Sequence, residues 1–274
     1  MTTQPTVLAV LADAAGAAEC LDAAREAAAI LPGARLRALH VRPDPETTII
    51  PSEEILTPPQ REALMLQAAS EAAALHGRFL DWRARQAPGL AAEWLDVKGD
   101  VAQEVARHGR HAALIAMAAP GPHAHGRAEA AFRAALFDSH RPLLRVPVGE
   151  PAHAPRRIAI AWKESAVCRR AIAEALPWLR HAEQVDVLHS VARDRSELDA
   201  ARALLEGLGV AAHVHALHHA TGPVGVQLLA EAGTLRADWL VIGAYRRPPV
   251  AEWLLGGVTR VVLQDARLPV FLMH

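Results

Sequence analysis

One pattern of short apolar runs and helical stretches occurs twice in this sequence. Thr6 to Ala12 is an apolar run that precedes an alanine-rich helical stretch, and Arg157 to Trp162 begins a second series of the same kind. Internal similarity of this type indicates two copies of one structural unit. Strands that alternate with helical patterns form βαβ crossovers, and therefore parallel sheets with helices on both faces. The pattern predicts two α/β domains, each with an open, mostly parallel, five-stranded sheet.

The predicted strands recur in the same order in both copies. Each copy has a second strand that ends near a Leu-His pair, Leu39-His40 or Leu188-His189, and a third strand followed by a glycine, Gly99 or Gly222. Fourth strands are predicted at 114–117 and 239–242, and fifth strands at 142–146 and 269–273. Three prolines and a glycine interrupt the periodicity in 147–156, where the domain boundary is predicted. The predicted domains are 1–148 and 156–274.

Most of the extra length of the first copy lies between its second and third strands. Five prolines occur in 43–60, and a long helix is predicted over 61–86. Apolar residues at spacings of three and four form one stripe along this helix: Leu64, Ala68, Ala72, Leu75, Phe79 and Trp82. The stripe indicates a helix that covers a face of the sheet. A partner-binding role for the isoleucines of the preceding loop is the alternative.

Composition and charge exclude several classes of function. The net charge of -1 provides no basic surface of the kind that binds nucleic acid. The two cysteines, Cys20 and Cys168, form no CxxC pair, which favours a reducing cytoplasm over a disulfide framework. No apolar run is long enough to span a membrane, and the first residues lack the pattern of a signal peptide. We therefore expect a cytoplasmic protein.

The candidate ligand site lies in the second copy, beyond the carboxyl ends of the strands, where sheets of this class bind ligands. Gly243 directly follows the fourth strand, and Gly256 and Gly257 precede the last helix. Glycines at these places allow backbone N–H groups to approach an anion, and a helix start attracts negative charge.

The residues around these glycines resemble the universal stress protein family. That family has a loop of Gly, two residues, Gly, nine residues, Gly, then Ser or Thr; here Gly243 is followed by Ala244-Tyr245, Arg246, nine residues and Gly256-Gly257. The final Leu-Pro-Val-Phe-Leu-Met-His segment and the order of elements in both halves are also similar to tandem bacterial members. The resemblance implies ATP or another adenine nucleotide as ligand. It also implies an internal pseudo-dimer through the closing strands, 143–148 and 270–274, and further self-association as a homodimer.

The phosphate loop departs from the family pattern, so two interpretations stay open. Arg246 replaces a glycine, Pro248 and Pro249 remove N–H donors, and Gly257 lacks the hydroxyl of Ser or Thr. Lys163 stands where nucleotide-binding members tend to carry an acidic residue. The arginines and Lys163 offer charge to a phosphate instead. The chain is predicted to be a stress-response binding or protective module, with an ATP-binding second domain, and with weak hydrolysis, as the alternative.

The first copy has no comparable anion site. Alignment of the copies places Ala118 at the position of Gly243, and Glu129 and Ala130 at those of Gly256 and Gly257. A carboxylate at this helix start repels a phosphate. The first copy is therefore predicted to be structural.

Neither a metal site nor a catalytic residue is predicted. Among the 15 histidines, His213 and His215 share one face of a strand, but no acidic or cysteine residue lies near them in sequence. GxSxG, HExxH and GxxxxGK[ST] motifs are absent. Ser165 is expected to cap the helix that follows it.

Overall fold

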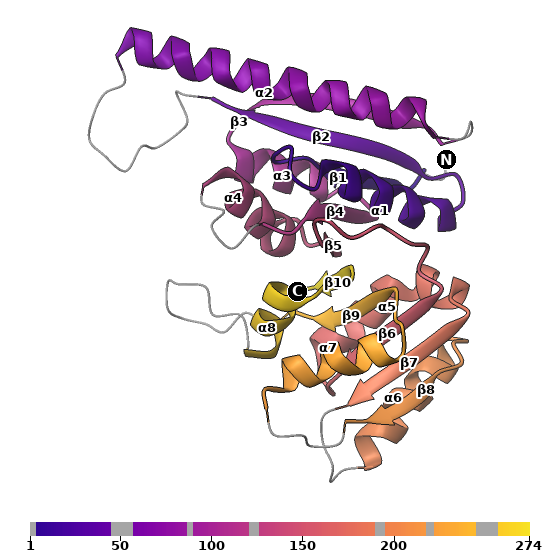
Figure 1. Ribbon diagram of the computed structural model, residues 1–274. Coiled ribbons are helices and arrows are strands. Elements are labelled where there is room, and N and C mark those ends of the chain that lie inside the picture. The colour runs from indigo at the N-terminus through magenta and orange to yellow at the C-terminus, as the bar shows by residue number, and fades with distance from the viewer. Residues whose placement is uncertain are drawn as a thin grey trace. The chain divides into compact units, whose positions relative to one another are not determined.

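The computed structural model describes residues 4–44, 57–86, 90–120, 126–189, 195–217, 222–244 and 257–274. The chain divides into two compact units, Met1–Arg141 and Pro142–His274. Each unit contains a twisted sheet with helices on both faces, as the sequence predicts (Figure 1). None of the described helices is long and apolar enough to cross a membrane.

Four parallel strands form the sheet of the first unit, in the order β3-β2-β1-β4. Their bounds are β1 Thr6–Val10, β2 Arg35–Pro43, β3 Ala92–Gly99 and β4 Leu114–Ala118. The central strand β1 is buried along its whole length, so it reads as a continuous apolar run. The order reverses direction between β1 and β4.

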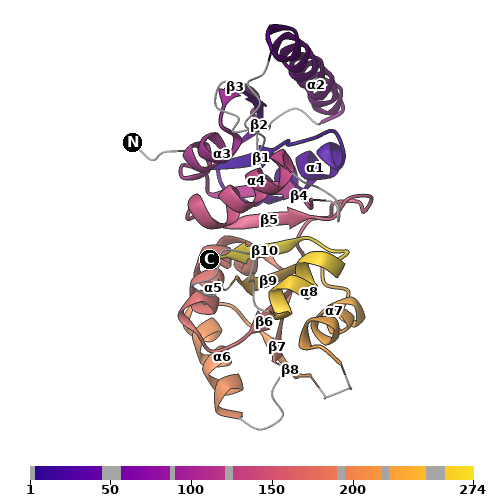
Figure 2. The ribbon, with the colours of Figure 1, turned by 90° about the vertical axis from the view of Figure 1, so that its left-hand side faces the viewer.

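Two layers of helices cover this sheet. Helices α1 (Ala17–Ile30) and α2 (Pro58–Ala84) contact each other on one face. Helices α3 (Val101–Gly109) and α4 (Arg127–Arg133) pack together, with a π-helical turn at Ala134–Asp138 that continues α4 (Figure 2). Asp100 caps α3 as expected, because its side chain accepts a hydrogen bond from the backbone N–H of Gln103 at 2.8 Å.

Helix α2 differs from its prediction in where it begins and in how much of its apolar stripe is buried. It begins at Pro58, because Thr57 and Gln60 form a capping box, with the Thr57 backbone N–H donating to Gln60 Oε1 at 2.9 Å. The proline-rich stretch therefore contains the helix start. The predicted stripe is buried from Ala68 to Trp82, whereas Leu64 is 45% exposed. The N-terminal end of the predicted stripe, at Leu64, therefore lies outside the buried part of the helix.

The second unit contains six strands in the order β5-β10-β9-β6-β7-β8. Five of them, β10, β9, β6, β7 and β8, are parallel; their bounds are β6 Arg157–Trp162, β7 Gln184–His189, β8 His213–Ala216, β9 Trp239–Gly243 and β10 Val270–Met273. Strand β5 (Leu143–Val146) is antiparallel to β10, with Arg145 opposite Val270 and Leu143 opposite Leu272. The expected pairing of the two closing strands is observed.

This pairing explains where the chain divides. Strand β5 closes the first sequence repeat, yet it groups with the second unit because its partner β10 lies there. The predicted limits 1–148 and 156–274 describe the repeats, and as such they remain a prediction. The division by contacts comes before β5, between Arg141 and Pro142.

Four helices and an aromatic cluster complete the second unit. Helices α5 (Ala166–His181) and α6 (Arg195–Gly207) cover one face, and α7 (Val224–Thr234) and α8 (Gly257–Asp265) cover the other (Figure 2). The rings of Trp178, Trp239 and Phe271 lie 5.8 to 6.4 Å apart between α5 and strands β9 and β10. Large aromatic rings fix how the helix packs on the sheet.

Charged side chains line the outer strand of the first sheet. On β3, Glu93 and Asp96 accept from Arg37 and Arg42 of β2 at 2.8 and 2.9 Å. Lys98 Nζ lies 3.3 Å from Asp44 Oδ1 just beyond β2. These cross-strand pairs fix the register of the outermost strand.

Candidate functional site

The candidate site lies at the carboxyl end of the second sheet, where β6 and β9 are neighbours. The strand order changes direction between these two strands, since β6 leads to β7 on one side and β9 to β10 on the other. Crevices at such points are where open α/β sheets bind ligands. Of the three predicted site glycines, Gly243 and Gly257 lie within the described residues, and Gly256 lies outside them.

Gly243 is required by packing. A Cβ atom on this residue would lie 3.1 Å from the backbone nitrogen of Cys168 and 3.1 Å from Val167 Cγ1. Both belong to the first turn of α5, so the absence of a side chain lets β9 end directly against that turn. Its φ is not among the positive values of the chain. The prediction treated Gly243 as a source of backbone freedom, whereas the structure shows a close approach between strand and helix.

Gly257 begins α8 and has open space around it. No atom of the residues that the structure describes lies within 4 Å of the position that its Cβ would occupy. The first turns of α7 and α8 are in contact, because a Cβ on Gly225 would lie 3.1 Å from the Val258 carbonyl oxygen. The starts of both helices therefore lie at the carboxyl end of the sheet. Arg246, Pro248 and Pro249, which alter the family loop, lie outside the described residues.

The other end of α8 is held by a buried arginine. Arg145 of β5 is 6% exposed, and its Nη1 donates to the Ala266 carbonyl oxygen at 2.6 Å, one residue past the helix. Burial lowers the pKa of this guanidinium to about 10, which is still well above neutral pH. A positive charge at a helix C-terminus opposes the negative end of the helix dipole. The sequence does not reveal this contact, because it joins residues far apart in the chain.

The loop after β6 carries a cation and a helix cap. Lys163 is exposed at this edge of the sheet. Ser165 caps α5 as expected, with its Oγ accepting from the Cys168 backbone N–H at 3.2 Å. Glu164 is paired with Arg169 through two hydrogen bonds of 2.7 and 2.9 Å, which raise the pKa of that arginine.

A buried histidine occupies the same place in both repeats. His40 Nδ1 lies 2.9 Å from the Leu11 carbonyl oxygen, and His189 Nδ1 lies 3.4 Å from that of Trp162. A carbonyl oxygen can only accept, so Nδ1 carries the proton in these contacts. The contact joins the ends of the first two strands of each repeat. It gives a structural reason for the repeated Leu-His pair.

The indole nitrogen of Trp162, the last residue of β6, is buried. Trp162 is 4% exposed, and its Nε1 has no hydrogen-bond partner among the described residues. Arg169 lies over its ring, with the guanidinium carbon 6.0 Å from the centroid. A buried N–H without a partner costs free energy, and such groups occur where a ligand or water completes the bonding. No sequence pattern identifies this atom, because its isolation depends on the packing around it.

In the described part of the first unit, different residues occupy the positions that correspond to the site glycines. Strand β4 ends at Ala118, in place of a glycine, and Glu129 lies in the first turn of α4. Ala130, the predicted counterpart of Gly257, is half-buried within that helix. His123 and His125 of the intervening loop lie outside the described residues.

One histidine of the second unit has an acidic partner that its local sequence does not show. His215 Nε2 lies 2.8 Å from Asp186 Oδ1, across the pairing of β7 and β8. Asp186 is buried and also accepts from Gln184 Nε2 at 2.8 Å. No group of three potential metal ligands occurs among the residues that the structure describes. The Asp186–His215 pair is a structural contact between neighbouring strands.

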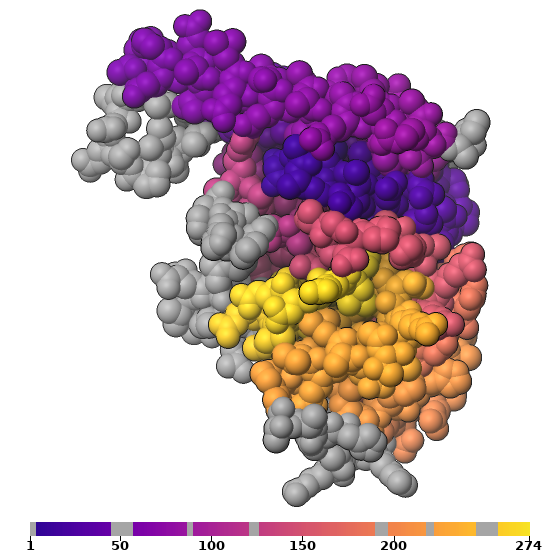
Figure 3. Space-filling view, in the orientation of Figure 1, coloured from indigo at the N-terminus to yellow at the C-terminus, as the bar shows by residue number. Residues whose placement is uncertain are grey.

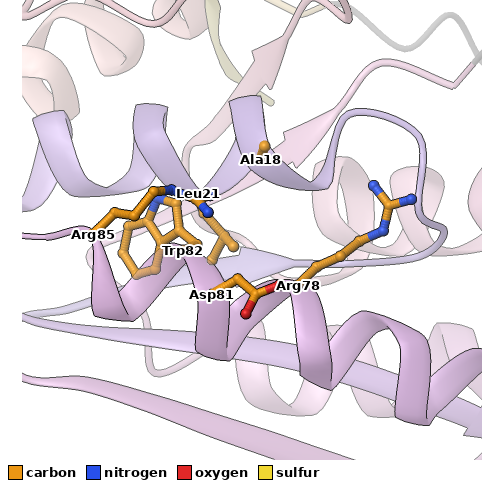
Figure 4. A pocket seen from close by; sticks show the side chains of 6 residues that line it. All are labelled: Ala18, Leu21, Arg78, Asp81, Trp82 and Arg85. Atoms are coloured by element: carbon orange, nitrogen blue, oxygen red, sulfur yellow. The ribbon is translucent and has the colours of Figure 1, made fainter.

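A small hollow lies between α1 and α2 in the first unit. Its volume is about 130 Å³, and Figure 4 shows Trp82 and Leu21 at its base with Arg78, Asp81 and Arg85 around it. Trp82 Nε1 is already bonded to Asp22 at 2.8 Å. Sites for small organic ligands have volumes of roughly 300 to 1,000 Å³. This hollow is too small for a nucleotide.

Known proteins are similar to this chain in two respects, the sequence of the second repeat and the fold. The sequence model of the universal stress protein family matches residues 173–274. A universal stress protein from Archaeoglobus fulgidus has a similar fold, with a TM-score of 0.70 and 17% identity over 98% of this chain and 95% of that one. A protein of unknown function from Pseudomonas aeruginosa has a TM-score of 0.58 and 16% identity over 99% and 92%. Among curated proteins, none matches significantly.

Proposed function

We propose that this chain, of which residues 173–274 match the sequence model of the universal stress protein family, is a stress-response binding module whose second repeat binds an adenine nucleotide. ATP is the first ligand to test. The proposed site is formed by Gly243, Gly256 and Gly257 together with Lys163. The buried, unpaired cysteines favour a cytoplasmic location for this activity.

The observation that carries this proposal is the open start of α8. Among the described residues, no atom lies within 4 Å of the Cβ position of Gly257, and Lys163 is exposed at the same edge of the sheet. The free N–H groups and dipole of a helix start favour an anion, and an exposed amine adds charge. Trp162, the last residue of β6, carries a further donor, because its Nε1 has no hydrogen-bond partner among the described residues. A phosphate group suits these donors.

We expect each chain to bind a single nucleotide, because the first repeat differs at the corresponding helix start. In the first repeat, Glu129 puts a carboxylate into the first turn of the corresponding helix. That charge opposes phosphate binding. We therefore expect one bound nucleotide per chain at saturation, measured by isothermal titration calorimetry with ATP and Mg²⁺.

Mass spectrometry of the freshly purified, denatured protein is the direct test. A tightly bound ATP, ADP or AMP is released on denaturation and detected by its mass. A weakly bound nucleotide is detected instead by the rise in melting temperature on addition of ATP and Mg²⁺. Absence of both signals contradicts the proposal. Phosphate release no faster than in a blank without protein separates binding from hydrolysis.

Two matched glycine variants test the position of the site. Gly257→Asp puts a carboxylate at the open start of α8, where it favours the helix but repels a phosphate. We expect it to abolish the ATP-induced thermal shift without lowering the melting temperature of the free protein. Gly233→Asp makes the same change at an exposed position near the end of α7, where a Cβ also meets no atom. It should retain the ATP-induced shift.

A further inference from the structure

Helix α2 has a second apolar side that faces solvent. Among the described residues, six large hydrophobic side chains are exposed, and four of them lie on α2. At 3.6 residues per turn, Leu66 and Leu80 share the solvent-facing side, whereas Leu64 continues the buried stripe and Met65 lies between the two sides. The helix buries its other side against the sheet and α1. Figure 3 shows the outward side of α2 uncovered along the first unit. Apolar surface concentrated on one helix is typical of an interaction site.

The solvent-facing side of α2 forms a continuous uncharged stripe, here called the outer face. At 3.6 residues per turn, five residues share this side of the helix: Leu66, Ala69, Ala73, Gly77 and Leu80. Leu66 is 66% exposed, and Leu80 is 40% exposed. Gly77 is in the middle of the helix, where glycine is destabilising relative to alanine, yet its Cβ position has no atom within 4 Å. Packing among the described residues does not explain this glycine.

We propose that a second copy of this chain binds here, through antiparallel packing of the two α2 helices around a two-fold axis at Ala73. The outer face is symmetric about Ala73, since Leu66 and Leu80 are equally distant from it in sequence, as are Ala69 and Gly77. An antiparallel pair therefore sets Leu66 against the partner subunit's Leu80, and Ala69 against the partner subunit's Gly77. A face that complements itself in this way forms a closed dimer.

Small residues at the centre allow the two helices to approach closely. Interaxial distances of helix pairs depend on the side chains at the contact, and Ala69, Ala73 and Gly77 place little volume there. The two leucines at each end then cover the gap. Overlap from Glu62 to Ala84 gives a contact about 33 Å long at 1.5 Å per residue.

Charge favours the same register. Glu62 and Arg83 lie near opposite ends of α2, Glu62 in line with the outer face and Arg83 toward one margin of it. In the antiparallel pair Glu62 lies beside the partner subunit's Arg83, and the two-fold axis repeats this contact. Both side chains are exposed, and no ion pair recorded among the described residues involves either one. Arg83 is already held against the ring of Phe79, at 5.6 Å from its centroid. Complementary charges of this kind fix register and partner orientation.

Cysteine cross-linking tests the axis directly. Ala73→Cys lies on the two-fold axis, so it should form an intermolecular disulfide with its own counterpart under mild oxidation with copper phenanthroline. Leu66→Cys alone should not, because its counterpart lies about 21 Å away along the helix, but it should cross-link when mixed with Leu80→Cys. The native Cys20 and Cys168 are buried and do not interfere. Exposed Val226→Cys on α7 is the control. Failure of Ala73→Cys to cross-link, or self-linking of Leu66→Cys, overturns the proposal.

Sedimentation velocity over a range of concentrations gives the second test. We expect a concentration-dependent dimer whose dissociation constant rises at least ~10-fold in Leu66→Glu/Leu80→Glu, about one decade of affinity. Val226→Glu, an equally exposed apolar position, should leave it unchanged. Glu62→Arg should weaken the dimer, and Glu62→Arg/Arg83→Glu should restore it. Circular dichroism confirms that each variant is folded. A wild-type protein that stays monomeric, or a dimer insensitive to the leucine pair, overturns the proposal.

Discussion

Two glycines of α7 differ in the space around them, and this difference predicts opposite effects of alanine. A Cβ on Gly225 would lie 2.7 Å from Val261 Cβ of α8, whereas a Cβ on Gly233 would meet nothing within 4 Å. Gly225→Ala should destabilise the protein by about 1 to 3 kcal/mol through overpacking. Gly233→Ala should stabilise it by roughly 0.5 to 1 kcal/mol through higher helix propensity. Urea unfolding measures both. Equal effects would contradict the close packing of α7 on α8.

The two buried cysteines make stability depend on pH. Burial raises the pKa of the Cys20 thiol to about 12 and that of Cys168 to about 11, from an ordinary value of 9.0. The unfolded chain thus releases these protons first as pH rises. Stability linked to the thiols is fully present below about pH 9 and is lost as pH rises toward the folded values. We expect the urea midpoint to fall more between about pH 8 and pH 10 in the wild type than in Cys20→Ala/Cys168→Ala. An identical fall in both would contradict this prediction.

At the level of elements, the first turn of α2 depends on the capping box of Thr57 and Gln60, which lies within a proline-rich stretch. Thr57→Ala removes the hydroxyl of the capping box at an exposed helix end. The change should weaken the first turn by about 1 kcal/mol without unfolding the domain. Amide hydrogen exchange of residues 58–62 should become faster, while exchange near Trp82 stays unchanged. Ser70→Ala, at an exposed position within the same helix, serves as the control and should have no such local effect.

The same helix shows what the sequence could and could not predict. Periodicity predicted the buried stripe from Ala68 to Trp82, because hydrophobic spacing records which side of a helix faces the core. Periodicity could not show that Leu64 is exposed, because the buried length of the helix depends on how far the strands beneath it extend. In the site, Gly243 was found by its place after a strand, but its steric role depends on the distance to α5. Asp186 was missed because its partner His215 is adjacent only across two strands.

At the level of the whole molecule, the division before β5 predicts how the chain tolerates truncation. A fragment of residues 142–274 keeps β5 on β10, whereas a fragment of 156–274 leaves the backbone groups of β10 unpaired on that side. The shorter fragment should melt about 4 °C lower, as expected for a loss of about 1 kcal/mol in a domain of this size. It should also associate through the open edge. Calorimetry and light scattering measure these effects. Fragments of equal stability would show that β5 is not part of the second unit.

The paired charges on β3 have a consequence for how the protein behaves in concentrated solution. An outer strand with unpaired backbone groups is a template for fibril growth, and charged residues along it oppose that growth. Glu93 and Asp96 are held by Arg37 and Arg42, so their carboxylates stay fixed along this strand. Salt screens exposed charges over a Debye length of about 3 Å at 1 M ionic strength. Resistance to aggregation along β3 is therefore electrostatic. This resistance should decrease at about 1 M salt, under conditions in which the protein stays folded.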